Sequence, residues 1–217
     1  GKFTIDNTTN NLTNRFPTAA TSGMISFLGG SFELLGNSAG TAFTIGSGYA
    51  TNTKATAFNA GQNNIIINQP VGATGPTILT FGAGPTPASL RDQTRMTINF
   101  SSTGSGTLGA SVTDPQIKYA TAPIINAGAA AAPSNMFANT ATGATVGWAT
   151  VNNTDWATYG ANGVVARAND LTTATTAGLQ AGTVTQAVLF NPGAAPAAAT
   201  GNIASSVIIF DPTAPAL

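Results

Sequence analysis

The fold class that the sequence predicts is all-β: a parallel β-helix (β-solenoid) with irregular loop excursions, with a β-sandwich as the alternative. Strong helix formers are scarce, since the chain has one glutamate and three lysines. Short runs of β-branched and aromatic residues recur, and they end at glycine, asparagine or proline. Only 6% of the 217 residues are charged, which suits stacked coils that carry ladders of uncharged Asn and Thr.

Each predicted strand is a short apolar run closed by a turn residue. In chain order the predicted strands are Phe3–Asp6, Met24–Leu28, Ser31–Leu35, Ala42–Ile45, Asn64–Asn68, Thr77–Phe81, Met96–Ser101, Ile117–Tyr119, Gly147–Val151, Asp155–Tyr159, Gly163–Ala166, Thr183–Asn191 and Ser205–Asp211. Phe32 and Leu34 alternate with polar residues, which indicates one buried face. The continuous runs Asn63–Gln69 and Ser205–Phe210 predict strands covered on both faces.

The chain divides into four regions by composition. Residues 1–170 are the predicted β-solenoid domain, and residues 171–190 are an additional strand region. Residues 191–204 form a linker rich in Pro, Ala and Gly, and residues 205–217 are the C-terminal strand and tail.

Charge and residue content exclude several functions. Seven basic and seven acidic residues cancel, so we expect no nucleic-acid partner and no anionic membrane partner. No apolar run reaches the length of a transmembrane helix. Histidine and cysteine are absent, and the few carboxylates are scattered singly, so we expect no metal site and no cofactor. The same scatter argues against a glycosidase, which needs two carboxyl groups across one sugar bond.

Two catalytic motifs occur without the context that they need. Gly36–Gly40 matches the G-x-S-x-G nucleophile motif, but the chain has no histidine to serve as its base. Gly104–Gly109 matches G-x-G-x-x-G, but the residues that follow do not start a helix. We interpret both motifs as turns, and the charged stretch Arg91–Arg95 as a solvated turn. The sequence therefore predicts no catalytic residue and no enzyme.

Both tryptophans lie in the stretch GWATVNNTDWATYGANGVVA, residues 147–166. Asn152-Asn153 is a predicted two-residue hairpin turn, because asparagine tolerates positive φ. With that loop, Ala149 opposes Trp156 and Trp148 opposes Ala157, so that each indole packs on an alanine and has a structural role. The alternative is a carbohydrate-binding surface, in which Trp148, Trp156 and Tyr159 contact a sugar.

The order of several phrases resembles proteins that carry autotransporter-associated β-strand repeats. The phrases here are GKFTIDNT at residues 1–8, MISFLGGSF at 24–32, MTINF at 96–100, IKYATAP at 117–123 and GWATVNNTDWATY at 147–159. The resemblance covers residues 1–167 and departs from the family pattern at the Ala/Gly/Pro-rich excursion 127–145 and after Asp170. It implies a right-handed parallel β-helix on the bacterial cell exterior, as in secreted passenger proteins, and it carries no catalytic residue over to this chain.

These observations lead to three functional expectations. The first is a non-catalytic extracellular or cell-surface structural protein that self-associates as a stalk, adhesin or filament subunit, a homo-oligomer or polymer. Its candidate assembly strand is the C-terminal run Ser205, Ser206, Val207, Ile208, Ile209 and Phe210. The second is a module that binds extracellular polysaccharide. The third is a β-helix polysaccharide lyase or hydrolase, which would need clustered charged side chains.

Overall fold

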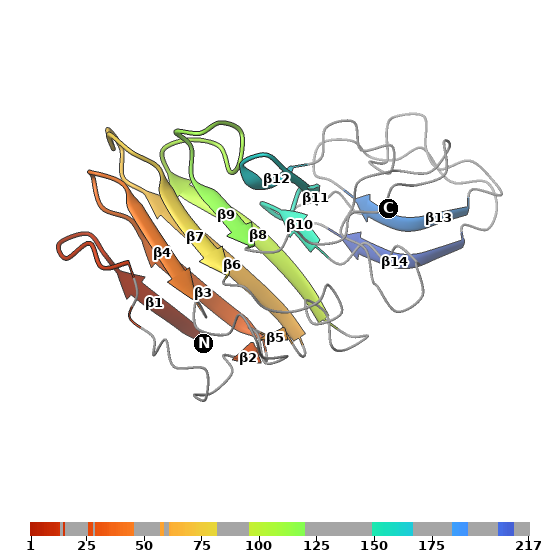
Figure 1. Ribbon diagram of the computed structural model, residues 1–217. Coiled ribbons are helices and arrows are strands. Elements are labelled where there is room, and N and C mark those ends of the chain that lie inside the picture. The colour runs from red at the N-terminus through yellow and green to blue at the C-terminus, as the bar shows by residue number, and fades with distance from the viewer. Residues whose placement is uncertain are drawn as a thin grey trace.

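The computed structural model describes residues 1–13, 15, 26–27, 29–45, 57–58, 61–81, 96–119, 149–166, 184–190 and 204–210. The regular structure in these residues consists of strands β1–β14 (Figure 1). The described part of the chain contains no helix, which confirms the predicted all-β class. No helix there is long and apolar enough to span a membrane.

The largest sheet has seven strands in the order β1-β3-β6-β8-β10-β11-β12. Its strands are β1 (Lys2–Asp6), β3 (Gly30–Leu35), β6 (Gly61–Gln69), β8 (Met96–Gly104), β10 (Ala149–Val151), β11 (Asp155–Gly160) and β12 (Gly163–Ala166). The first five are parallel, and β11 and β12 join by antiparallel pairing. The sheet therefore ends in a parallel edge strand at β1 and in an antiparallel meander at β12.

Three smaller sheets are parallel as well. The second sheet contains β4 (Thr41–Ile45), β7 (Thr77–Phe81) and β9 (Gln116–Tyr119). The third pairs β2 (Ser26–Phe27) with β5 (Ala57–Phe58). The fourth pairs β13 (Val184–Phe190) with β14 (Ala204–Phe210).

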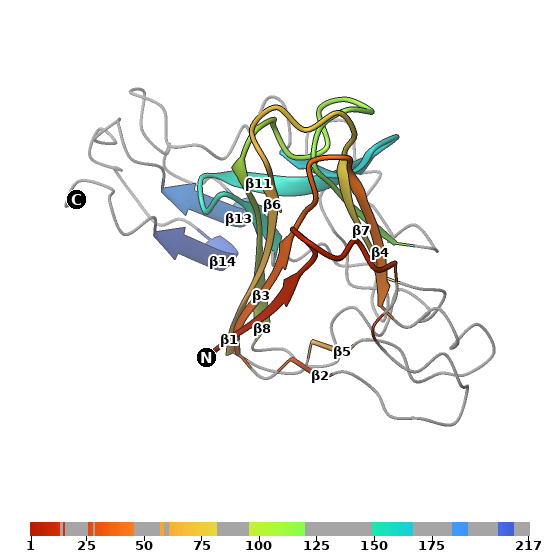
Figure 2. The ribbon, with the colours of Figure 1, turned by 90° about the vertical axis from the view of Figure 1, so that its left-hand side faces the viewer.

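The chain visits the first three sheets in a repeating order. After β2 it adds β3 to the seven-stranded sheet and β4 to the second sheet, and then β5, β6 and β7 repeat the same path. Strands β8 and β9 continue it. Figure 2, seen nearly along the stacking direction, shows the first sheet on one side, the β4/β7 sheet on the other, and β2 and β5 below them.

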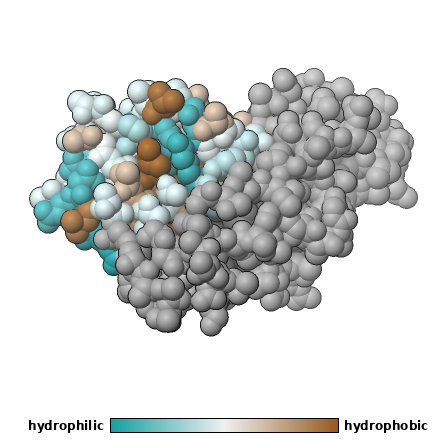
Figure 3. All heavy atoms as spheres, in the orientation of Figure 1, coloured by the Kyte–Doolittle hydropathy of each residue, from teal (hydrophilic) through white to brown (hydrophobic). Residues whose placement is uncertain are grey.

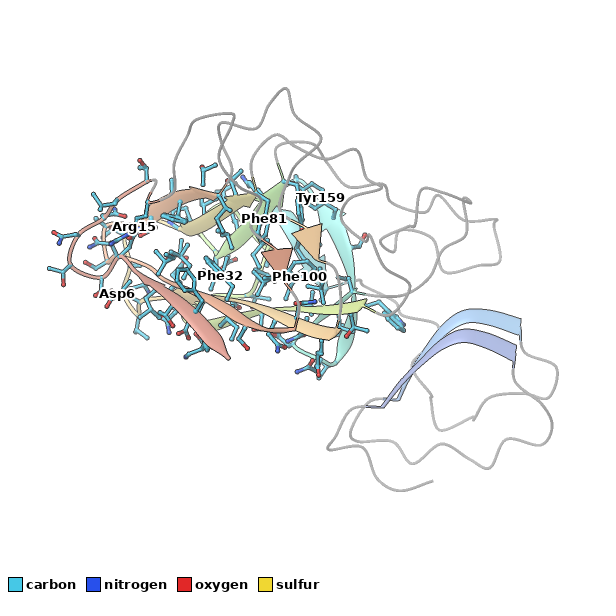
Figure 4. All side chains as sticks on the ribbon, turned by 90° about the horizontal axis from the view of Figure 1, so that it is seen from below. Asp6, Arg15, Phe32, Phe81, Phe100 and Tyr159 are labelled. Atoms are coloured by element: carbon cyan, nitrogen blue, oxygen red, sulfur yellow. The ribbon has the colours of Figure 1, made fainter. Side chains whose placement is uncertain are left out.

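The hydrophobic core lies between the two larger sheets and is built from rows of side chains in register. Phe32, Ile65, Phe100 and Val151 occupy one row across β3, β6, β8 and β10. All four are at most 2% exposed. Figure 4 shows Phe32, Phe81 and Phe100 within this interior. Rows of this kind arise because parallel strands in register place equivalent side chains directly above one another.

One prediction about burial is wrong. The run Asn63–Gln69 was expected to be covered on both faces, but its burial alternates along β6. Ile65 and Ile67 are fully buried, whereas Ile66 faces outward and is half-buried. The reason is that β6 has the core on one side only, as a half-buried strand of period two does.

A row of two buried amide side chains and two glycines lines the corner where the first sheet ends. Extending the strand pairing by one residue places Asn7 opposite Gly36 and Gly36 opposite Gln69. Gln69 in turn lies opposite Gly104 of β8. Asn7 and Gln69 are almost fully buried. A Cβ at Gly104, whose φ is +82°, would lie against the Gln69 carbonyl oxygen. Glycine is therefore required where the chain turns tightly over the coil before it.

Candidate functional site

The predicted assembly strand is present as a strand in the structure. Residues Ser205, Ser206, Val207, Ile208, Ile209 and Phe210 all lie in β14. β14 pairs in parallel with β13 of the same chain, with Val188 opposite Ile208 and Phe190 opposite Phe210. Among the described residues this sheet has no third strand, so each of its strands has an outer edge. The linker predicted at 191–204 lies outside the described residues except for Ala204.

The hairpin predicted around Asn152-Asn153 forms, with a different register. Both asparagines have positive φ, at 54° and 59°, and the Thr154 amide donates to the Val151 carbonyl at 3.1 Å. Thr154 is an additional residue in the loop, so Val151 pairs with Asp155 and Thr150 pairs with Trp156. The prediction that Ala149 opposes Trp156 is therefore wrong by one residue.

The aromatic residues proposed for sugar contact lie in different environments. The Trp156 side chain is 0% exposed, so it presents no ring face to a sugar in this structure. Tyr159 is partly buried on β11, and Trp148 lies outside the described residues. Figure 3 shows that the visible described surface is mostly hydrophilic or neutral, with separated hydrophobic patches.

The β11/β12 meander closes one end of the parallel stack. The Tyr159 hydroxyl accepts a hydrogen bond from the Tyr119 amide at 3.0 Å and donates to the Tyr119 carbonyl at 3.3 Å. A Cβ at Gly163 would lie against the Ile117 carbonyl oxygen, so β12 approaches β9 at backbone distance. Val164 is fully buried at this contact. The meander therefore covers β9, the last strand of the second sheet; we call this end the capped end.

An asparagine beneath the hairpin turn fixes it to the sheet. The Asn99 side-chain oxygen accepts from the Thr150 hydroxyl at 3.2 Å and from the Asn153 amide at 2.8 Å. Asn99 is 5% exposed. One amide oxygen thus joins β8, β10 and the turn, which explains why the turn begins where it does.

Tyr119 sits in an aromatic cluster behind the capped end. Its ring stacks on Phe81 with centroids 5.1 Å apart and lies 6.1 Å from the Tyr159 ring. Its hydroxyl is buried and has no hydrogen-bond partner among the described residues. Burial, with a smaller contribution from Tyr159, raises the pKa of Tyr119 well above its ordinary value of 10.0. No sequence pattern indicates this pair, because the two tyrosines are 40 residues apart.

The opposite end of the stack is formed by the edge strand β1. Ile5 is 6% exposed there, but Phe3 is 54% exposed although it packs on Phe32 with centroids 6.0 Å apart. The Lys2 ammonium lies 2.8 Å from a Glu33 carboxylate oxygen, to which the Thr4 hydroxyl also donates at 3.2 Å. We call this end, formed by β1 and the turn that follows it, the open end.

Arg15 organises the turn after β1, as Figure 4 shows for Arg15 and Asp6. Its guanidinium donates to the Asp6 carbonyl at 2.7 Å, to the Asn7 side-chain oxygen at 2.9 Å and to the Asn10 carbonyl at 3.3 Å. The hydroxyl and amide of Thr8 both donate to the Asp6 carboxylate. These bonds, and then the charge of Arg15, hold the pKa of Asp6 below its ordinary value of 3.8.

The two motif matches lie in turns of the structure. Gly36–Gly40 connects β3 to β4, where the Asn37 side-chain oxygen accepts from the Ala39 amide at 2.9 Å. Gly104–Gly109 begins at the last residue of β8 and leads into the loop before β9. Among the described residues no three acidic side chains gather where a metal ion could bind. The stretch Arg91–Arg95 lies outside the described residues.

No family model, curated protein or solved structure matches this chain.

Proposed function

We propose that this chain is a non-catalytic structural module of an extracellular or cell-surface protein. In this proposal it is a parallel β-solenoid that self-associates as a stalk, an adhesin or a filament subunit. The observation that carries the proposal is the repeating path of the chain through the same parallel sheets, with side chains stacked in register. A stack of this kind has no need of a binding cleft, because its function is to span distance and present a surface.

The spacing of equivalent residues supports a coil repeat. Asn64 bonds Ser31 across 33 residues, and Asn68 bonds Thr103 across 35 residues. Thr150 bonds Asn99 across 51 residues, which matches the longer connection after β9. Two coils of nearly equal length, followed by one with an insertion, are what a solenoid with loop excursions would give. Parallel crossovers are right-handed in about 98% of cases, so we expect a right-handed coil.

The chemistry of the chain suits assembly through strand edges. The first sheet ends at β1 in a parallel strand, and both strands of the β13/β14 pair are parallel edge strands. The outer backbone groups of these strands have no described strand beside them. Such edges are templates for another strand, and charged side chains are the usual means of blocking them. With 6% charged residues, this chain has few charges with which to do so.

The proposal is tested by observing the assembly state directly. The full chain is expected to form oligomers or filaments in negative-stain electron microscopy and in size-exclusion chromatography with light scattering. A chain lacking Asn202–Leu217, and so lacking the whole of β14, is expected to assemble less. A full chain that stays monomeric at high concentration would contradict the proposal, whereas undisturbed assembly of the shortened chain would contradict only the role of β14.

A further inference from the structure

The backbone of β1 presents a regular set of hydrogen-bonding groups to solvent. The Ser31 amide donates to the Gly1 carbonyl, and the Asn7 amide donates to the Leu35 carbonyl. In a parallel ladder the amide and carbonyl of one residue point to the same neighbour, and this direction alternates along the strand. The odd-numbered residues of β1 therefore bond to β3, and Lys2, Thr4 and Asp6 point away from it.

No described strand lies beside that outer edge. The Asp6 carbonyl there already accepts a bond from Arg15. The amides of all three outward-pointing residues, and the carbonyls of Lys2 and Thr4, face the side on which another strand would add. An added strand would satisfy these groups and would cover the exposed part of Phe3.

We infer that the open end binds the open end of a second copy of this chain, with the two β1 strands antiparallel and Thr4 opposite its own counterpart. In this register Lys2 of each copy lies opposite Asp6 of the other, and Phe3 lies opposite Ile5. Only pairs of outward-pointing residues then exchange backbone hydrogen bonds, as an antiparallel pair requires. The inference rests on the proposed function, because it names the partner of one strand edge.

Charge complementarity selects this register. Lys2 and Asp6 are the charged residues of β1, and they stand at its two ends. A parallel addition in the same register would place lysine beside lysine and aspartate beside aspartate, whereas the antiparallel register gives two opposite-charge pairs. Cross-strand pairs of opposite charge stabilise a sheet, and like charges directly opposite destabilise it.

The capped end explains why like ends should meet. The β11/β12 meander covers the other end of the stack, and its own residues Trp156 and Val164 are fully buried. A copy stacked head to tail would have to displace this meander, whereas no described strand covers the open end. The contact is therefore isologous, with one two-fold axis, and it closes as a dimer.

The test uses two single variants that should each fail to pair and should pair with each other. Lys2→Glu gives an edge with two acidic residues, and Asp6→Lys gives an edge with two basic residues. Sedimentation velocity over a concentration series should show a concentration-dependent dimer as the first step of association of the wild-type chain. Each variant alone should have a dimer association constant lower by about tenfold or more. An equimolar mixture should regain the dimer as a heterodimer.

Two further variants control the experiment. Thr4→Pro removes an amide that points to the outer edge and leaves the β1–β3 bonds in place, so it should abolish the dimer alone and in mixtures. Lys118→Glu makes the same charge change as Lys2→Glu but on β9, and it should dimerise like wild type. Thermal melts establish that each variant is folded.

The outcomes separate this inference from the proposed function. Wild-type assembly that neither charge variants nor Thr4→Pro weaken would overturn the β1 pairing and leave the proposed function standing. A mixture of Lys2→Glu and Asp6→Lys that stays monomeric would also overturn the pairing. A wild-type chain that is monomeric at every concentration would overturn both.

Discussion

The Tyr159 hydroxyl is bonded to both the amide and the carbonyl of Tyr119, so one side chain fastens the β11/β12 meander to the end of β9. The contact joins the last antiparallel strands to the parallel stack through backbone groups that the second sheet leaves available at its end. The capped end therefore depends on a side chain that occupies the place of a further strand.

Tyr159→Phe should destabilise the protein by about 1–3 kcal/mol, because it leaves a part-buried amide and carbonyl without their partner. The loss should appear in urea denaturation followed by tryptophan fluorescence, since Trp156 lies in the same strand. A Tyr159→Phe chain as stable as wild type would show that the hydroxyl does not fasten the meander.

Tyr119→Phe is the matched control, and its effect should be opposite. The Tyr119 hydroxyl is buried and bonds to no residue in the described part of the chain, so its removal deletes a desolvated polar group and leaves the aromatic packing on Phe81 in place. Stability should be unchanged or higher by about 1 kcal/mol. A substantial loss of stability in this variant would mean that the hydroxyl does have a partner in solution.

Alkaline pH should destabilise the wild-type protein through the same tyrosine. Its folded-state pKa is raised, so above the ordinary value of 10.0 the unfolded chain loses a proton that the folded chain keeps. The free energy of unfolding should then fall by about 1.4 kcal/mol per pH unit from this group. Urea denaturation at several pH values above 9 should show a shallower fall in Tyr119→Phe, and equal slopes would contradict the assignment.

Asp6 should contribute to stability on the acid side. Its folded-state pKa is lowered by Thr8 and Arg15, so its contribution is present above pH 3.8 and is lost as the pH falls through the folded-state value. Asp6→Asn should therefore flatten the decline in melting temperature below pH 4, measured on dilute protein. A melting temperature that declines below pH 4 as steeply in Asp6→Asn as in wild type would indicate that these bonds do not favour the ionised carboxylate.

Two glycines with similar backbone conformations should respond differently to alanine. Gly104 and Gly72 have φ of +82° and +75°. A Cβ at Gly104 would meet the Gln69 carbonyl, but a Cβ at Gly72 would meet nothing within 4 Å. We expect a loss of about 1 kcal/mol for Gly72→Ala and about 3 kcal/mol or more for Gly104→Ala. Equal losses of stability in chemical denaturation would mean that the backbone near Gln69 moves to accommodate a Cβ at position 104.

The sequence was sufficient to place most strands because each one is a run of β-branched or aromatic residues between turn residues. Thr77–Phe81 and Gly163–Ala166 coincide with β7 and β12. The strand β5, Ala57–Phe58, was not predicted, because two residues cannot show an alternating pattern. The predicted hairpin register was off by one because Thr154 belongs to the loop, where its amide donates to the Val151 carbonyl. The bond from the Asn153 amide to Asn99 of β8 holds this loop and is not visible in the sequence.

The open end could not have been found from the sequence. Lys2 and Glu33 become partners only through the pairing of β1 with β3, and that register is set by the apolar rows of the core. Likewise, the direction in which the Thr4 backbone points follows from bonds made by Gly1 and Asn7. The low charge content alone indicated that strand edges are sites of association. It did not indicate which edge pairs or which charged residues set the register.

The alternation of backbone direction along β1 has a consequence for deuterium uptake. In dilute solution the amide protons of Thr4 and Asp6 face water, and those of Phe3 and Ile5 are held by β3, so isotope labelling should find fast and slow sites at every second residue. Where two molecules pair through the outer edge of β1, deuterium exchange at the fast sites should become slower as the protein concentration rises. The exchange rates of the β1 amide protons thus report whether the molecule is monomeric or paired.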